Sequence, residues 1–139
     1  MKKKLFGLLL LASFSSFADS NDFNNFVEKV VGSYTTAGNA GCIGAFYNVD
    51  GNIQTVHVAN QDDMLIIEND RGELLASINL ANAKLSKHSS GTVTLCEGCL
   101  KGMDDLNSSS LAISKNGKIT FKREITGLVN NTVDKCELK

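Results

Sequence analysis

The sequence predicts an all-β domain: an antiparallel meander of about seven to nine strands, closed into a small barrel, with a short N-terminal helix. From Ser33 onward, apolar and polar residues alternate with the two-residue period of strands, and turn sequences recur at short intervals. The chain contains no proline, which leaves the strand interiors unbroken. Because a sheet of this size with exposed edges would aggregate, we expect it to close as a barrel or to fold over as a sandwich.

The N-terminus has the pattern of a secretory signal peptide. Three lysines at residues 2–4 precede an apolar run from Leu5 to Phe17, and Ser16-Phe17-Ala18 places small residues where signal peptidase reads them. The run is too short to cross a bilayer stably, and a buried or membrane-retained helix is the alternative interpretation. We therefore expect residues 1–18 to be cleaved and residues 19–139 to form one β-rich domain, periplasmic or secreted by a bacterium.

Charge and composition restrict the partners. Loss of the three lysines of the signal changes the formal charge from -1 to about -4. The longest basic groups after residue 18 are Lys84 with Lys87 and Lys122 with Arg123. We interpret them as solvated faces, so we expect no nucleic-acid partner. No cysteine follows Ala18 at the cleavage site, so we also expect no lipid anchor in the membrane.

An even number of cysteines in a small exported domain predicts disulfides. The four are Cys42, Cys96, Cys99 and Cys136, and three pairings are possible. We favour Cys96 with Cys99, which is local, and Cys42 with Cys136, which ties the start of the domain to its end.

The segment Cys96-Glu97-Gly98-Cys99 also has the spacing of a redox-active dithiol, in which a helix N-terminus lowers the pKa of the first thiol. Thr92 to Leu95 before it reads as a strand, whereas Leu100 to Met103 after it is a poor helix start, and no βαβ pattern surrounds it. A structural disulfide is therefore the favoured interpretation. Zinc ligation would need a second paired motif, which the sequence lacks.

The residues before Ser33 have the period of a helix. Its apolar stripe comprises Phe23, Phe26, Val27, Val30 and Val31. Ser20, Asn21 or Asp22 supplies the N-cap, and Gly32 ends the helix. We expect this helix to plug one end of the core, with binding of a partner as the alternative.

Tight turns separate the predicted strands. The turns are Asp50-Gly51, Asn69-Asp70-Arg71-Gly72 and Asn116-Gly117, where the residues tolerate positive φ. The predicted strands are 43–49, 53–59, 64–68, 73–80, 92–96, 111–114 and 118–125.

At Val31-Gly32-Ser33-Tyr34, directly after the helix, the chain resembles the opening of lipocalin and related calycin barrels. In those families a helical turn precedes a Gly-x-aromatic start of the first strand. The resemblance implies a meander barrel that holds an apolar ligand. The position of Tyr34 is usually Trp in the family, and this chain has no Trp.

No catalytic or metal-binding pattern is found. His57 is expected to point to solvent between Val56 and Val58, and His88 is expected in a loop. The acid pairs Asp62-Asp63 and Asp104-Asp105 lack the spacing of calcium loops and are interpreted as turn residues. We expect no metal and no cofactor.

These observations favour a non-enzymatic protein that binds a small apolar ligand inside the barrel, where Ala76 and Gly44 would leave room. One alternative is an interaction or inhibitor protein that acts on an envelope or secreted protein through the loop from Cys96 to Asn107. The other is a thiol-disulfide oxidoreductase that uses Cys96 and Cys99.

Overall fold

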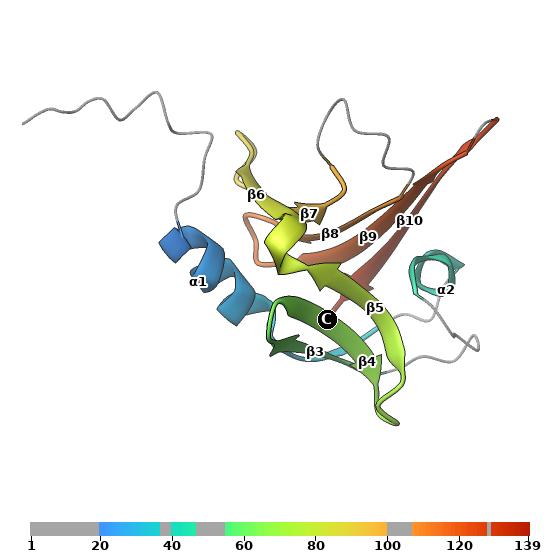
Figure 1. Ribbon diagram of the computed structural model, residues 1–139, viewed down its shortest axis with the longest axis horizontal. Coiled ribbons are helices and arrows are strands. Elements are labelled where there is room, and N and C mark those ends of the chain that lie inside the picture. The colour runs from blue at the N-terminus through green and yellow to red at the C-terminus, as the bar shows by residue number, and fades with distance from the viewer. Residues whose placement is uncertain (1–19, 37–39, 47–54, 100–106, 128) are drawn as a thin grey trace, which may run out of the picture.

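The computed structural model describes residues 20–36, 40–46, 55–99, 107–127 and 129–139. These residues form a mostly β fold of two antiparallel sheets, with α1 and α2 at opposite ends of them (Figure 1). The predicted signal peptide and the Asp50-Gly51 turn lie outside the described residues. Counted over the described part of the chain, the two sheets contain four and five strands, at the upper end of the predicted number.

The predicted helix is α1 (Ser20–Val30). Phe26, Val27 and Val30 are buried in the core, and Phe23 packs against it. Val31, which was expected to complete the apolar stripe, follows the last helical residue and is 43% exposed. The helix therefore lies against one end of the sheets with a narrower apolar face than predicted.

The prediction of a strand at residues 43–49 is wrong where the structure describes it. The segment instead forms the short helix α2 (Ala40–Ala45). One helical turn places Cys42, Ala45 and Phe46 on the same side, and all three are buried. Tertiary packing against the C-terminal strand thus overrides the strand propensity of the run that begins at Ile43.

One sheet contains four strands in the order β2 (Gly32–Thr35), β3 (Thr55–Gln61), β4 (Met64–Asn69) and β5 (Leu74–Asn79). Alternate residues point inward, as the two-residue period predicts: Val56 and Val58 in β3 and Leu65 and Ile67 in β4 are buried. The β4–β5 turn is the predicted one, with Gly72 at φ +76°.

The other sheet has the strand order β10-β9-β8-β7-β6. The bounds are β6 (Ala83–Lys87), β7 (Val93–Glu97), β8 (Asn107–Ile113), β9 (Ile119–Thr126) and β10 (Asn131–Leu138). The sequence predicts β7, β8 and β9 but misses β6 and β10. Both are outer strands of the sheet, and in β10 only Cys136 and Leu138 are buried, which leaves little apolar pattern to detect.

The prediction of a closed barrel is wrong, and two separate sheets take its place. The chain leaves β5 through a 3₁₀-helix (Leu80–Asn82), which the Asn79 side chain caps, and enters β6 in the other sheet. At the opposite edge, the backbones of Thr35 and Lys139 exchange two hydrogen bonds of 2.9 Å. Among the described residues, this pair provides the backbone hydrogen bonds that join the two sheets, between the end of β2 and the residue after β10.

The core lies between the two sheets. Its fully buried large side chains come from both sheets: Phe121, Leu65, Ile67, Leu75, Ile78, Leu95 and Leu111. Phe46 of the segment after α2 stacks on Phe121 at a ring-centroid distance of 5.5 Å. No helix in the described part of the chain is long and apolar enough to span a membrane.

Candidate functional site

Disulfides join the cysteines in the two favoured pairs, Cys42–Cys136 and Cys96–Cys99. The first bridge fastens α2 to β10, and both of its cysteines are fully buried. Cys96 lies near the end of β7 and is 7% exposed. Gly98 then turns the chain, at φ +82°, toward Cys99. No helix begins at the described residues 97–99, so the helix N-terminus expected of a redox-active dithiol is missing there.

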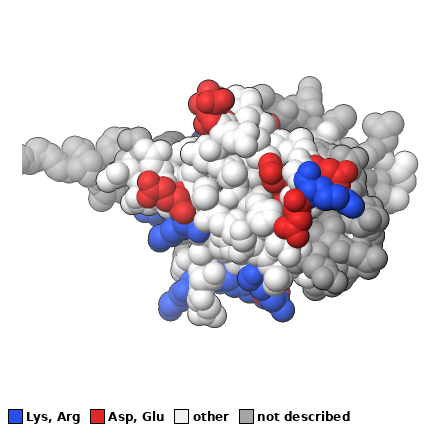
Figure 2. All heavy atoms as spheres, turned by 90° about the horizontal axis from the view of Figure 1, so that it is seen from below, with Lys and Arg blue, Asp and Glu red and all other residues white. Residues whose placement is uncertain are grey.

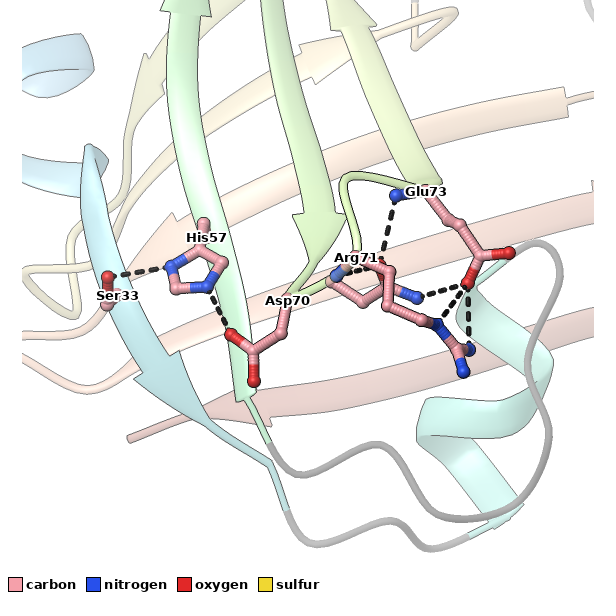
Figure 3. Close-up of polar contacts among 6 residues, drawn as sticks. Ser33, His57, Asp70, Arg71 and Glu73 are labelled. Atoms are coloured by element: carbon pink, nitrogen blue, oxygen red, sulfur yellow. Dashed lines mark hydrogen bonds and ion pairs between the residues drawn. The ribbon is translucent and has the colours of Figure 1, made fainter.

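The sheet brings together three polar residues that sequence reasoning did not connect (Figure 3). His57 Nδ1 lies 2.8 Å from Ser33 Oγ, and His57 Nε2 lies 2.6 Å from Asp70 Oδ1. Ser33 stands directly opposite His57 in the β2–β3 pair, and Asp70 follows β4 in the turn. As predicted, His57 lies on the outer side of β3, between the buried Val56 and Val58.

The order hydroxyl, imidazole, carboxylate is that of a nucleophile, a base and its orienting acid. The Asp70 side chain is 70% exposed, however, and the His57 side chain is 38% exposed. Neither cavity described below is lined by any of the three residues. The contacts of His57 with Ser33 and Asp70 tie β2 to the β4–β5 turn, and we call these three residues the clamp.

The turn that carries Asp70 is itself fixed by hydrogen bonds (Figure 3). Asn69 Oδ1 accepts from the backbone N–H groups of Arg71 and Glu73 at 2.9 and 3.0 Å. The Glu73 carboxylate accepts from Asn69 Nδ2 at 2.8 Å and from Arg71 Nε at 3.0 Å. These hydrogen bonds, from Asn69 first and then Arg71, together with the Arg71 charge, hold the pKa of Glu73 below its usual value.

The remaining predicted polar positions are in turns or peripheral. His88 Nε2 lies 3.2 Å from Thr94 Oγ1 beside the β6–β7 turn. Asp62 and Asp63 form the β3–β4 turn, with Asp62 at φ +54°. The pair Asp104-Asp105 lies outside the described residues, as does most of the loop from Cys96 to Asn107. Within the described ranges, no group of three or more His, Cys, Asp or Glu side chains could hold a metal ion.

A cavity of about 430 Å³ opens between α1 and the ends of β6, β7 and β8, and we call it the helix groove. It is lined by Asp22, Asn25, Phe26, Lys29, Leu85, Lys87, Gly91, Val93, Ile113, Ser114 and Lys115. Phe26 and Leu85 are 4% and 5% exposed and supply apolar walls, to which Val93 and Ile113 contribute. Its volume falls within the roughly 300–1,000 Å³ of small-molecule sites.

Charged side chains surround these apolar walls. Lys87 Nζ lies 2.9 Å from Asp22 Oδ2, which joins β6 to α1 by an ion pair. Lys29 and Lys115 have no ion-pair partner among the described residues. The helix groove therefore combines an apolar wall with an unneutralised positive rim.

A second hollow, of about 570 Å³, lies on the outer face of the five-stranded sheet. Hydroxyl side chains and lysines of β7 to β10 and their turns line it, and Ser114 borders both cavities. Figure 2 shows one face of the molecule, on which acidic and basic groups lie at several places with uncharged surface between them.

Neither cavity could be predicted from the sequence, because the residues that line each one come from separate elements. Only the helical period of α1 was a usable signal, and it pointed to the core-facing residues rather than to Lys29. Comparison with protein families, with curated proteins and with solved structures finds no match for this chain. The resemblance to lipocalins therefore stays a prediction.

Proposed function

We propose that this chain is an exported, non-enzymatic binding protein that takes a small amphiphilic anion in the helix groove. The observation that carries the proposal is the pairing of nearly buried apolar walls, Phe26 and Leu85, with the cationic rim of the groove. Binding sites for small molecules are mostly apolar clefts with a few polar groups that fix orientation. An acyl or aromatic body against the walls and a carboxylate at the rim would match this chemistry.

The charges support an anionic head group. Three lysines and one aspartate line the groove, and the aspartate is engaged by Lys87. This leaves Lys29 and Lys115 to receive a negative group, although the whole chain has a formal charge of -1. A local positive site on a protein of negative net charge attracts an anion that the rest of the surface repels.

The proposal places the ligand at the end of the fold rather than inside it. The space between the sheets is occupied by fully buried side chains, among them Phe121 and Leu65. Ala76, expected to leave room, is itself buried in this core. Gly44, also expected to leave room, lies in α2, where a Cβ would clash with the Asp134 carboxyl group. The helix groove replaces the interior as the proposed site.

A fluorescent fatty acid such as 11-(dansylamino)undecanoic acid tests this proposal, with displacement by dodecanoate and by dodecanol. We expect saturable binding, with dodecanoate displacing the probe better than dodecanol. The double variant Lys29→Gln/Lys115→Gln should remove most of the preference for the acid, because each lost charge-assisted contact is worth about tenfold in affinity.

The control for this experiment is Lys139→Gln, which removes one positive charge outside both cavities. It should bind the probe like the unchanged protein. Absence of saturable binding, or equal affinity for acid and alcohol in the unchanged protein, would refute the amphiphilic-anion proposal.

Export is part of the proposal and rests on the pattern of residues 1–18. Intact-mass measurement on protein recovered from a bacterial periplasm should give a chain that begins at Asp19 and lacks four hydrogens relative to its reduced form. A chain that keeps residues 1–18 would refute cleavage.

A further inference from the structure

The hollow on the outer face of the five-stranded sheet plays no part in the proposed function. Its lining contains five Ser or Thr side chains and three lysines, with a single glutamate. Apolar ligands have little to bind there, because Ala112 is its one aliphatic lining residue. The lining of the hollow therefore suits a ligand that accepts hydrogen bonds and carries negative charge.

Strand register sets three of these side chains in one row. Ser110 of β8 is paired with Lys122 of β9, and Lys122 is paired with Lys135 of β10. Residues paired in this way share a face of the sheet, with Cβ atoms about 4.5–5.5 Å apart. Two ammonium-bearing side chains thus stand side by side, an arrangement that is destabilising unless a negative group lies between them.

Ser110 adds an independent observation. It is the buried polar residue of the described chain, 3% exposed, and it lines the hollow. Its hydroxyl has no hydrogen-bond partner among the described residues. A buried hydroxyl without a partner costs free energy, and a bound acceptor would remove that cost.

The nearby carboxylates neutralise the row only weakly. Lys122 Nζ lies 3.9 Å from Glu124 Oε1, and Lys118 Nζ lies 3.7 Å from Glu137 Oε1, with side chains 37% to 58% exposed. Exposed ion pairs of this kind are weak and easily exchanged. Lys135 has no ion-pair partner within the described residues.

We propose that Ser110, Lys122 and Lys135 form a binding site for a phosphate group, either inorganic phosphate or a phosphate monoester. A phosphate offers oxygens to both ammonium groups and to the hydroxyl at once, and it carries close to two negative charges at neutral pH. A single carboxylate would leave half of the paired lysine charge uncompensated.

The test is a titration of the ¹⁵N-labelled full chain by NMR, with inorganic phosphate in one arm and glycerol phosphate in the other. We expect saturable shifts of the amides of residues 110, 122 and 135 in at least one arm, and the arm with the higher affinity identifies the source. Lys135→Gln should lower the affinity about tenfold, the worth of one charge-assisted hydrogen bond.

Ser110→Ala separates binding from a structural role. Because it removes a buried hydroxyl that has no partner among the described residues, it should leave thermal stability unchanged or higher while it lowers phosphate affinity. Lys139→Gln, the matched loss of one lysine outside the hollow, should bind like the unchanged protein. Absence of saturable shifts in both arms, or an equal loss of affinity in Lys139→Gln and Lys135→Gln, would overturn the proposal.

Discussion

The Tyr34 hydroxyl donates a hydrogen bond of 2.8 Å to the backbone carbonyl of Val30. Val30 is the last residue of α1, and Tyr34 belongs to β2. The contact therefore restrains the angle between the helix and the strand that follows it. It also satisfies one of the carbonyls that the end of a helix leaves without a partner. The position of α1, and with it the helix groove, depends partly on this bond.

We expect Tyr34→Phe to lower the free energy of unfolding by about 1 kcal/mol, the usual worth of one partly buried hydrogen bond. Desolvation raises the pKa of Tyr34, so the stability that its neutral form contributes is present below about pH 10 and is lost as the pH rises toward the raised value. Urea unfolding of both proteins at neutral and alkaline pH measures the effect. An identical alkaline loss in Tyr34→Phe would contradict it.

The disulfide between Cys42 and Cys136 joins residues 94 positions apart in the sequence and so closes a long loop. In the chain-entropy description a loop of that length stabilises the fold by about 4–5 kcal/mol. We expect Cys42→Ala/Cys136→Ala to lose that amount in urea unfolding. Cys96→Ala/Cys99→Ala, which opens a separation of only three residues, should lose much less and serves as the control. Equal losses would show that loop length does not govern stability here.

Local periodicity was enough to predict α1 and most of the strands. Phe26, Val27 and Val30 carry the helical period, and Val56, Val58, Leu65 and Ile67 carry the strand period, because each set faces the core from one element. The helix α2 was missed because a disulfide and its packing against β10 fix Cys42, and neither is visible in the local pattern. The strand β10 was missed because its first residues are exposed.

The candidate sites were much less predictable than the fold. The contact of His57 with Ser33 joins residues 24 apart and depends on the β2–β3 register, for which the short, polar β2 offers little signal. The sequence did predict that Asp70 lies in the turn after β4, the strand that pairs with β3. The β9–β10 register places Lys122 beside Lys135. The sequence could not predict this pair because β10 itself was not predicted.

Gly98 and Gly117 both have positive φ, +82° and +84°, but their surroundings differ. A Cβ at residue 98 would clash with the backbone carbonyl oxygen of Asn107, whereas a Cβ at residue 117 meets nothing within 4 Å. We expect Gly117→Ala to cost about 1–2 kcal/mol from the left-handed backbone alone. Gly98→Ala should cost more, because the neighbouring strand must also move. Thermal unfolding of the pair measures the difference, and equal costs would rule out the close approach.

The lowered pKa of Glu73 predicts an acid-dependent contribution to stability. Because the folded-state pKa is depressed, the contribution is present above the unfolded pKa of about 4.5 and is lost as the pH falls through the lower, folded pKa. Glu73→Gln should therefore flatten the acid limb of a plot of stability against pH. Glu68→Gln, a nearby carboxyl on β4, is the control. An unchanged acid limb in Glu73→Gln would contradict the assignment.

The contacts of His57 with Ser33 and Asp70 should be measurable as a coupling free energy between these residues. In a double-mutant cycle, His57→Ala and Asp70→Ala should show a coupling of about 0.2–1 kcal/mol, the range of exposed ion pairs, because both side chains are partly or largely in water. His57→Ala with Asp63→Ala is the control cycle, since Asp63 lies in the β3–β4 turn at the other end of the strand, and its coupling should be zero. Hydrogen exchange at residues 33–35 should also quicken in His57→Ala, because β2 pairs with β3 and loses its side-chain tether. If exchange there stays unchanged and the first cycle shows no coupling, the contacts of His57 hold neither β2 nor the turn.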